Sequence, residues 1–297
     1  MAERRTEGRH ALSDGLHAIS GAEVVSRILD CQKQALAALV PAFPQIIQAA
    51  QARADALRRG GKMGYAGAGS SGLMALADCL ELPGTFGISP DRVPMMFAGG
   101  VEALLHLRGG VEDDPALALA DLERADLRAG DVVLCLAASG GTPYTLTIAE
   151  RAAAQGVTVV GLSNVHSSRL LALSGIAIFL NSGPEIVTGS TRMGAGTVQK
   201  VALNMISVLI GIALGHVHDG YMVNLMADNT KLNDRAIRIV SAISGVGLDR
   251  AKVALEQTQG AVKPAILVAQ GMTEAGAQSA LAGSSGHLAR LLKPDSE

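Results

Sequence analysis

The sequence predicts an α/β fold in which a parallel sheet is covered by helices on both faces. Between residues 61 and 230, short apolar runs alternate with segments that have apolar residues at helical spacing. Such alternation is typical of βαβ units, whose strands pair in parallel. Glycine-rich turns follow several of these runs. The five runs expected to form strands are residues 63–66, 93–98, 132–137, 157–162 and 176–180.

Helical patterns without strands flank this region and define three expected domains. Residues 1–60 are expected to form a helical arm with two helical stretches, the second of which ends at the stop signal Gly60-Gly61. Residues 61–230 form the sheet domain, and residues 231–297 form a small C-terminal helical module. The expected helices of the arm and the module are residues 21–39, 44–59, 234–243, 249–258 and 274–281.

Composition excludes several classes of protein. The chain has 297 residues, and its formal net charge of -2 argues against nucleic-acid binding, which needs clustered Lys and Arg. Three scattered cysteines without a C-x-x-C pair fit reduced thiols. Residues 1–14 are polar, unlike a signal peptide. The apolar run 201–215 is shorter than the roughly 20 residues of a spanning helix, so we expect a buried core helix in a cytoplasmic protein without membrane contact.

The first of three loops that could carry chemistry follows the run 63–66. It reads Gly67-Ala68-Gly69-Ser70-Ser71-Gly72 and matches G-x-G-x-x-G, the dinucleotide-binding fingerprint. In that fingerprint an acidic residue lies at the end of the second strand, whereas Asp91 lies before the second expected strand of this chain. A turn that binds pyrophosphate does so mainly through backbone N–H groups, whereas this turn carries two adjacent hydroxyl side chains. A dinucleotide site is therefore disfavoured, and a plain strand-to-helix turn that needs glycine remains an alternative to a ligand loop.

The second loop, Ser139-Gly140-Gly141-Thr142-Pro143-Tyr144, follows the run 132–137. Pro143 suits the first helical turn and Thr142 is a natural N-cap. Capping explains Thr142 but not the adjacent Ser139 and the two glycines. Backbone N–H groups and hydroxyls at the start of a helix can bind an anion, so this loop is a candidate anion site. The third loop, residues 188–192, contains Ser190 and follows Glu185. Hydroxyl-rich loops at one sheet edge favour a site for a phosphorylated sugar.

Two glutamates are candidate acid–base groups. Glu81 lies between Leu80 and Leu82 near the end of a helix, where partial burial would raise its pKa and suit it as a general acid. A solvated glutamate at a helix end is the simpler interpretation. Glu112 lies outside the cap formed by Asp114 and Pro115, and alone it would count as loop surface. His216 and His218 lack partners with metal-ligand spacing, so structural or surface roles are favoured.

Together these segments resemble the N-acetylmuramic acid 6-phosphate etherase family of the sugar isomerase (SIS) superfamily. The resemblance covers nearly the whole chain from Thr6. The matching pieces are Thr6-Glu7-Gly8-Arg9, residues 67–72 with Asp78 and Glu81, Pro83, Thr85-Phe86-Gly87, Ala98-Gly99-Gly100, Glu112-Asp113, Ala138-Ser139-Gly140 with Thr142-Pro143-Tyr144, residues 185–192 and residues 196–200.

The resemblance implies a lyase that acts on a 6-phosphorylated amino sugar, with a three-layer αβα SIS domain and a small UBA-like C-terminal module. The family eliminates lactate across C2–C3 and then adds water, without a metal or redox cofactor. It forms homodimers with the sites near the subunit interface. By this resemblance Glu81 is the acid and Glu112 the base, and substrate would contact Gly69, Ser70, Ser71, Ser139, Gly140, Gly141, Thr142, Glu185 and Ser190.

This chain departs from the family at three positions that usually carry a cation. Leu73 and Gly141 replace arginines, and Gly194 replaces a lysine. Because a hydrogen bond to a charged group contributes about 1.5–3 kcal/mol, these losses could change the preferred substrate. Arg9 and Arg192 are candidates to compensate.

Two other functions stay open on the same scaffold. An aldose–ketose phosphosugar isomerase would need one base, with Glu185 or a histidine as candidate. A non-catalytic regulator would bind a phosphosugar without turnover, and the paired glutamates argue against it. The favoured function is the etherase reaction.

Overall fold

The computed structural model describes residues 5–106, 109–227 and 229–292. The outermost residues of the expected arm and C-terminal module, 1–4 and 293–297, lie outside this description. The chain divides into two compact units. The first, here called the sheet unit, comprises residues 1–79 and 91–207, and the second, the helical unit, comprises residues 80–90 and 208–297. The domain boundaries expected near residues 60 and 230 stay a prediction.

The sheet unit is built on five parallel strands in the order β2-β1-β3-β4-β5. Each expected run forms a strand, with ends within two residues of those predicted. The strands are β1 Met63–Gly67, β2 Met95–Phe97, β3 Val132–Leu136, β4 Thr158–Ser163 and β5 Ile176–Phe179. From β1 the chain goes to β2 on one side and then to β3 on the other, so the strand order reverses between β1 and β3. Open α/β sheets bind ligands at such a reversal, outside the carboxyl ends of the strands.

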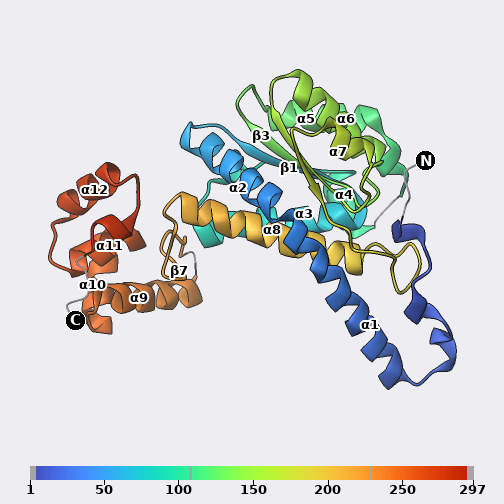
Figure 1. Ribbon diagram of the computed structural model, residues 1–297. Helices are drawn as coiled ribbons and strands as arrows, with labels where there is room; N and C mark the ends of the chain where they lie inside the picture. Colours follow the sequence, from blue (N-terminus) through green and yellow to red (C-terminus); the bar gives the residue numbers. More distant parts are fainter. Residues whose placement is uncertain (1–4, 107–108, 228, 293–297) are drawn as a thin grey trace. The chain divides into compact units, whose positions relative to one another are not determined.

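Helices cover both faces of this sheet, as Figure 1 shows, and the predicted α/β fold is confirmed. One face carries α5 (Pro115–Ala125), α6 (Pro143–Ala154) and α7 (Arg169–Leu173), and the other carries α2 (Phe43–Arg58). Every residue of β1 and of β3 is buried. Because both faces are covered, these strands are apolar throughout and do not alternate.

Two helix starts follow the signals in the sequence. Asp114 precedes Pro115, and its Oδ1 accepts hydrogen bonds from the backbone N–H groups of Ala116 and Leu117 at 2.9 and 3.0 Å. Thr142 precedes Pro143 in the same way at α6, but its side chain makes no capping bond. The predicted cap is therefore confirmed at Asp114, whereas at Thr142 only the position is confirmed. The Thr142 hydroxyl remains available for other contacts.

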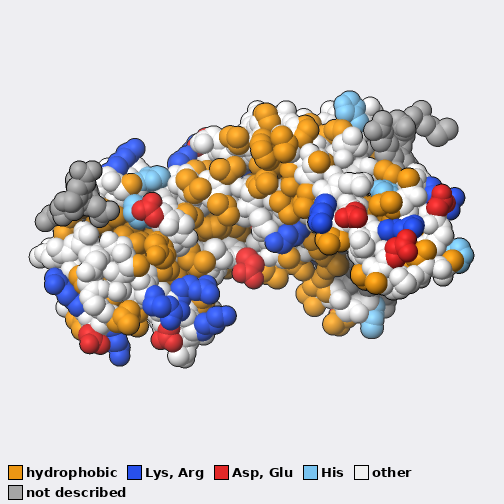
Figure 2. Space-filling model, turned by 60° about the horizontal axis from the view of Figure 1, so that its bottom comes forward, with side chains coloured by type: hydrophobic (Ala, Val, Ile, Leu, Met, Phe, Trp, Pro, Cys, Tyr) orange, Lys and Arg blue, Asp and Glu red, His pale blue; other side chains and the backbone are white. Residues whose placement is uncertain are grey.

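The arm of the sheet unit exposes apolar side chains. Helix α1 (Gly21–Leu36) begins at Ser20, whose hydroxyl accepts from the Glu23 N–H at 3.3 Å, and Figure 1 shows α1 projecting beyond the sheet. Figure 2 shows apolar side chains gathered on one face of the molecule, and apolar side chains grouped at a protein surface indicate a binding surface. The exposed residues, here called the arm patch, are Val25, Leu29, Val40, Phe43 and Ile47, each at least 40% exposed.

The helical unit packs four helices around its own core. They are α9 Thr230–Ser244, α10 Leu248–Gln257, α11 Val262–Ala269 and α12 Glu274–Gly283. Three correspond to predicted helices, whereas α11 was missed because it is buried on most of its surface and so lacks an amphipathic pattern. A UBA-like arrangement stays a prediction.

The apolar run near residue 201 forms α8 (Gly194–Ala213), a core helix. It is long and apolar enough to span a membrane, as is the run 21–58, but 56% of its window is buried inside the protein. The predicted core helix is therefore confirmed. The remaining elements are α3 Gly69–Phe86, α4 Gly100–Leu105, β6 Val217–His218, β7 Tyr221–Met222 and the 3-10 segments Arg5–Glu7, Ala11–Ser13, Leu16–Ala18, Ala37–Ala42, Pro90–Arg92, Gly109–Asp113 and Leu288–Arg290.

Candidate active site

A pocket of about 330 Å³ opens at the carboxyl edge of the sheet, where the order of strands reverses. The segments that leave β1 and β3 form its floor, because these neighbouring parallel strands end at the same edge. Hydroxyl and carboxylate groups face it from several further segments. The lining residues are Thr6, Glu7, Ala68, Gly69, Ser70, Ser71, Glu112, Ala137, Ala138, Ser139, Thr142, Gly189 and Thr191.

The first glycine-rich loop brings the start of α3 against β1. A Cβ atom on Gly67 would lie 2.9 Å from the Cα of Gly72, so this turn needs glycine for close packing of helix and strand. Ser70 and Ser71 follow in the first turn of α3, and both line the pocket. The N–H groups at a helix start have no partners within the helix, and together with the two hydroxyls they suit an anion. A role of this loop in binding a ligand stays a prediction.

The second loop shapes the pocket from the β3 side. Gly140 has φ of +60°, and a Cβ atom there would lie 2.6 Å from the Ser163 hydroxyl, so only glycine fits. The Ser139 hydroxyl accepts a hydrogen bond from the Gly141 N–H at 3.2 Å. Thr142 lines the pocket, and its side chain makes no capping hydrogen bond. Ser139 and Thr142 thus add two hydroxyls beside those of the first loop.

Glu112 holds a half-buried carboxylate inside this pocket. It comes from the 3-10 segment before α5, and an ideal Cβ on Gly69 would lie 2.6 Å from its Oε1. The close approach is possible because Gly69, with φ of +51°, has no side chain. Burial, and secondarily the neighbouring Asp113, raises the pKa of Glu112. A carboxylate with a raised pKa is a stronger base at neutral pH.

Glu81 is not among the residues that line this pocket. It lies on α3 about three turns beyond Ser70, roughly 16 Å along the helix at 1.5 Å per residue. Its side chain is exposed, as is the neighbouring Leu80, so the burial expected from the sequence is not found in the single chain. Periodicity could not reveal this, because it does not show which face of α3 lacks a partner.

Glu185 differs from its expected place. It is 1% exposed and does not line the pocket. Its two oxygens accept hydrogen bonds from the N–H groups of Gly194 and Ala195 at 2.8 and 2.9 Å, so it caps the start of α8. This carboxylate therefore stabilises the start of a helix. Its position does not support the direct contact with substrate that the sequence predicted.

Three more of the expected residues lie beside the pocket and do not line it. Ser190 lies between Gly189 and Thr191, which do line the pocket. Gly140 is buried and Gly141 is exposed next to Ser139. Their contacts with substrate stay a prediction.

The sequence did not identify the contribution of the N-terminal segment. Thr6 is 2% exposed, and Glu7 brings a second carboxylate to the pocket close to Gly189. Both belong to the stretch that carries the resemblance, but its spacing gives no clue that residues 6 and 7 approach residues 189 and 191. Only the tertiary structure shows that five segments far apart in the sequence meet here.

No Lys or Arg lines the pocket in the part of the chain that the structure describes. Arg9 pairs with Asp14, and Arg192 is exposed, so neither replaces the missing family cations at the pocket wall. Within the same residues no group of three His, Cys, Asp or Glu side chains is placed to hold a metal. An anion here would be bound by hydroxyl and N–H groups.

Known proteins resemble this chain in sequence and in fold. Residues 30–164 match the SIS domain family. An N-acetylmuramic acid 6-phosphate etherase of Deinococcus radiodurans is 38% identical over 290 residues, covering 97% of this chain and 95% of that protein. Another, of Symbiobacterium thermophilum, is 42% identical over 262 residues, covering 88% and 87%. A phosphoheptose isomerase structure from Francisella tularensis has a TM-score of 0.48 and 20% identity, covering 66% of this chain and 98% of that one. The chain belongs to the N-acetylmuramic acid 6-phosphate etherase family.

Proposed function

We propose that this chain cleaves the lactyl ether of N-acetylmuramic acid 6-phosphate in the cytoplasm, yielding N-acetylglucosamine 6-phosphate and D-lactate. The observation that carries the proposal is the half-buried Glu112 carboxylate against the start of α3, inside a pocket lined by hydroxyls. Relatives with this name at 38–42% identity over most of the chain support it. No metal or redox cofactor is required.

In the proposed reaction the sugar phosphate is bound by the hydroxyls of Ser70, Ser71, Ser139 and Thr142 and by the N–H groups that begin α3. Glu112 removes the proton from C2 as the bond from C3 to the lactyl oxygen breaks, and a C2–C3 double bond forms. An acid gives a proton to the departing lactate oxygen. Water then adds across the double bond, with its oxygen at C3 and a proton returned to C2.

The acid in this proposal is Glu81 of a second copy of the chain. Within one chain Glu81 is exposed and about three turns of α3 away from the serines of the pocket. The arm patch and the exposed Leu80 are apolar surface that a second copy would cover. A two-fold dimer uses the same surface on both chains, so each would give its Glu81 to the other's site. Light scattering during gel filtration should give the mass of two chains, and the mass of one chain would contradict this arrangement.

A lactate-release assay tests the function directly. Purified protein with N-acetylmuramic acid 6-phosphate should release D-lactate, and Glu81→Gln should abolish the release. Release that persists in Glu81→Gln would exclude Glu81 as the acid. No release by the wild type, combined with thermal stabilisation by another phosphosugar, would contradict the etherase proposal and favour an isomerase or a regulator.

Restoring an arginine at Gly141 should strengthen binding of the phosphate. Gly141 does not have a positive φ, and a Cβ atom there would meet only the Ser139 hydroxyl, at 3.8 Å, so the side chain fits. Because the pocket lining lacks a cation, Gly141→Arg should lower KM about five-fold through a charge-assisted hydrogen bond. Gly175→Arg, an exposed position before β5 at the other edge of the sheet, is the control and should leave KM unchanged. An unchanged KM in Gly141→Arg would place the phosphate elsewhere.

Glu7 is expected to bind the uncharged part of the sugar. A carboxylate repels phosphate but accepts hydrogen bonds from hydroxyl or amide N–H groups, and Glu7 faces the pocket. Glu7→Gln should raise KM about ten-fold with a smaller change in kcat, because hydrogen bonds to charged groups are the stronger ones. Glu123→Gln, on the exposed side of α5, is the matched control. A fall in kcat alone would instead indicate a role in the chemical step.

A further inference from the structure

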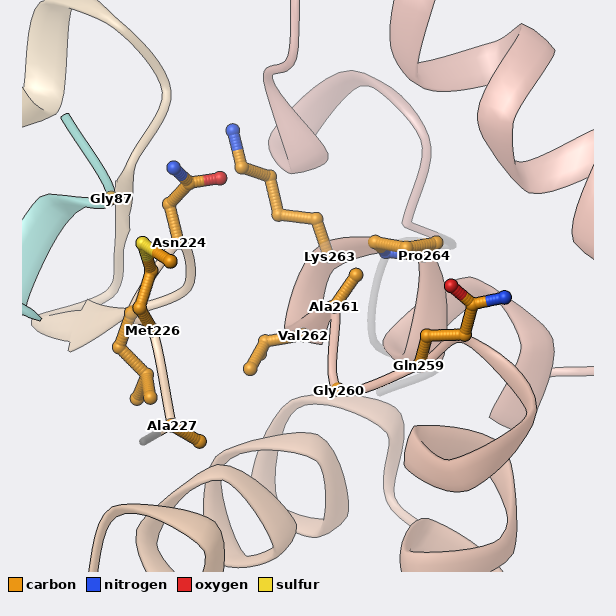
Figure 3. Close-up of a pocket in the computed structure, with 11 residues that line it drawn as sticks. Gly87, Asn224, Met226, Ala227, Gln259, Gly260, Ala261, Val262, Lys263 and Pro264 are labelled. Carbon is orange, nitrogen blue, oxygen red and sulfur yellow. The ribbon is translucent and has the colours of Figure 1, made fainter. Parts of the chain in front are cut away.

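The helical unit contains a second cavity, of about 380 Å³, that the proposed reaction does not use. Figure 3 shows it between the segment around residues 224–227 and the turn that leads into α11. Its walls combine apolar side chains with polar groups, and the polar side chains among them are Asn224, Gln259 and Lys263. The lining residues are Gly87, Asn224, Leu225, Met226, Ala227, Gln259, Gly260, Ala261, Val262, Lys263 and Pro264.

Within the part of the chain that the structure describes, Lys263 is a buried cation without an anionic partner. It is 8% exposed, and its Nζ donates a hydrogen bond to the Gly286 carbonyl at 3.2 Å. No carboxylate among the described residues pairs with it. Burial accordingly lowers the pKa of Lys263 to about 8, so the ammonium form still predominates at neutral pH. A buried charge that lacks a counter-charge is costly, and an anion that entered the cavity would offset this cost.

Asn224 presents a polar atom at the same end of the cavity. Its Nδ2 donates to the Phe86 carbonyl at 2.9 Å, and an ideal Cβ on Gly87 would lie 2.6 Å from that Nδ2, so the amide is held in place. Figure 3 shows the Asn224 amide and the Lys263 ammonium at one end, with Met226 and Val262 along the walls. No side chain caps the first N–H groups of α11 beside Lys263. These N–H groups could help to bind an anion.

We propose that this cavity binds a small monocarboxylic acid with an apolar body, whose carboxylate pairs with the Lys263 ammonium. One cation balances one negative charge, whereas a phosphate dianion would keep one charge without a counter-charge in the cavity. Leu225, Met226 and Pro264 would contact the body of the ligand. The volume falls within the roughly 300–1,000 Å³ of small-molecule sites.

Thermal unfolding of the full chain with a series of straight-chain carboxylates from propanoate to octanoate tests this. At least one acid should raise Tm in a saturable way, since a ligand that binds only the folded state stabilises it. The amide of the same acid and inorganic phosphate should not. Stabilisation by the amide to the same extent, by phosphate instead, or by none of the acids would overturn the proposal.

Two variants connect the response to the cavity. Lys263→Met should fold with a Tm at or above that of the wild type, because it removes a buried charge, and it should lose the response to the acid. Lys252→Met, an exposed lysine of α10, should keep it. Met226→Glu changes a residue that is 58% exposed and brings a competing carboxylate to the cavity, so it should also lose the response. A response retained in either Lys263→Met or Met226→Glu would place the acid elsewhere.

Discussion

Replacing Glu112 by Gln is expected to lower kcat for lactate release by about 10²–10⁴-fold, the usual contribution of a general base. The amide keeps the shape of the side chain against Gly69 but cannot accept the C2 proton. Because the pocket hydroxyls are untouched, KM should change little. Asp113→Asn, assayed on the pH plateau above the acid limb, is the matched control, since Asp113 is the exposed neighbour and does not line the pocket. A Glu112→Gln variant with more than a tenth of wild-type kcat would exclude Glu112 as the base.

The same carboxylate should set the acid side of the pH profile. Burial raises its pKa above the usual 4.5, so protonation begins at a higher pH than for an exposed glutamate. A base works only when deprotonated, and kcat should therefore fall as the pH drops through this raised value. Asp113→Asn removes the secondary cause of the shift and should move the acid limb to lower pH. An acid limb that does not move would mean that another group controls it.

Joining an inactive Glu81→Gln chain to an inactive Glu112→Gln chain is expected to restore about half of wild-type activity per dimer. If each site takes Glu112 from one chain and Glu81 from the other, one of the two sites in such a mixed dimer has both glutamates intact. Co-expression with two different tags allows the mixed dimer to be purified. Each variant paired with itself should stay inactive.

The reverse combination gives the opposite result and serves as the control. A dimer of a wild-type chain and a Glu81→Gln/Glu112→Gln chain has no site with both glutamates if the sites are shared, so it should be nearly inactive. If both glutamates acted within one chain, this dimer would have about half of the activity and the first mixed dimer would have none. The two measurements together distinguish the arrangements without reference to how stable each variant is.

Local signals in the sequence were sufficient for the sheet and for two glycine-rich loops. The alternation of apolar runs and helical segments depends on neighbours in the chain, and the five strands of the parallel sheet lie within two residues of where it predicts them, whereas the short strands β6 and β7 were not predicted. Helix α11 was not predicted, because a helix that is buried on most sides has no polar face from which its helical period can be recognised. Thr142 shows a similar limit of prediction from sequence. Its N-cap position follows from the neighbouring Pro143, but the sequence does not show that its hydroxyl makes no capping bond.

By itself the sequence determined the fold class, the family and the residues of the two loops that end β1 and β3, because each depends on short-range patterns. Only the tertiary structure decided which side chains meet. It brought Thr6 and Glu7 to Gly189, placed Glu112 against Gly69, turned Glu185 inward to cap α8 and left Glu81 exposed. These contacts join segments far apart in the chain, and burial depends on what packs against a residue. The spacing of residues along the sequence therefore predicts neither these contacts nor the burial of each side chain.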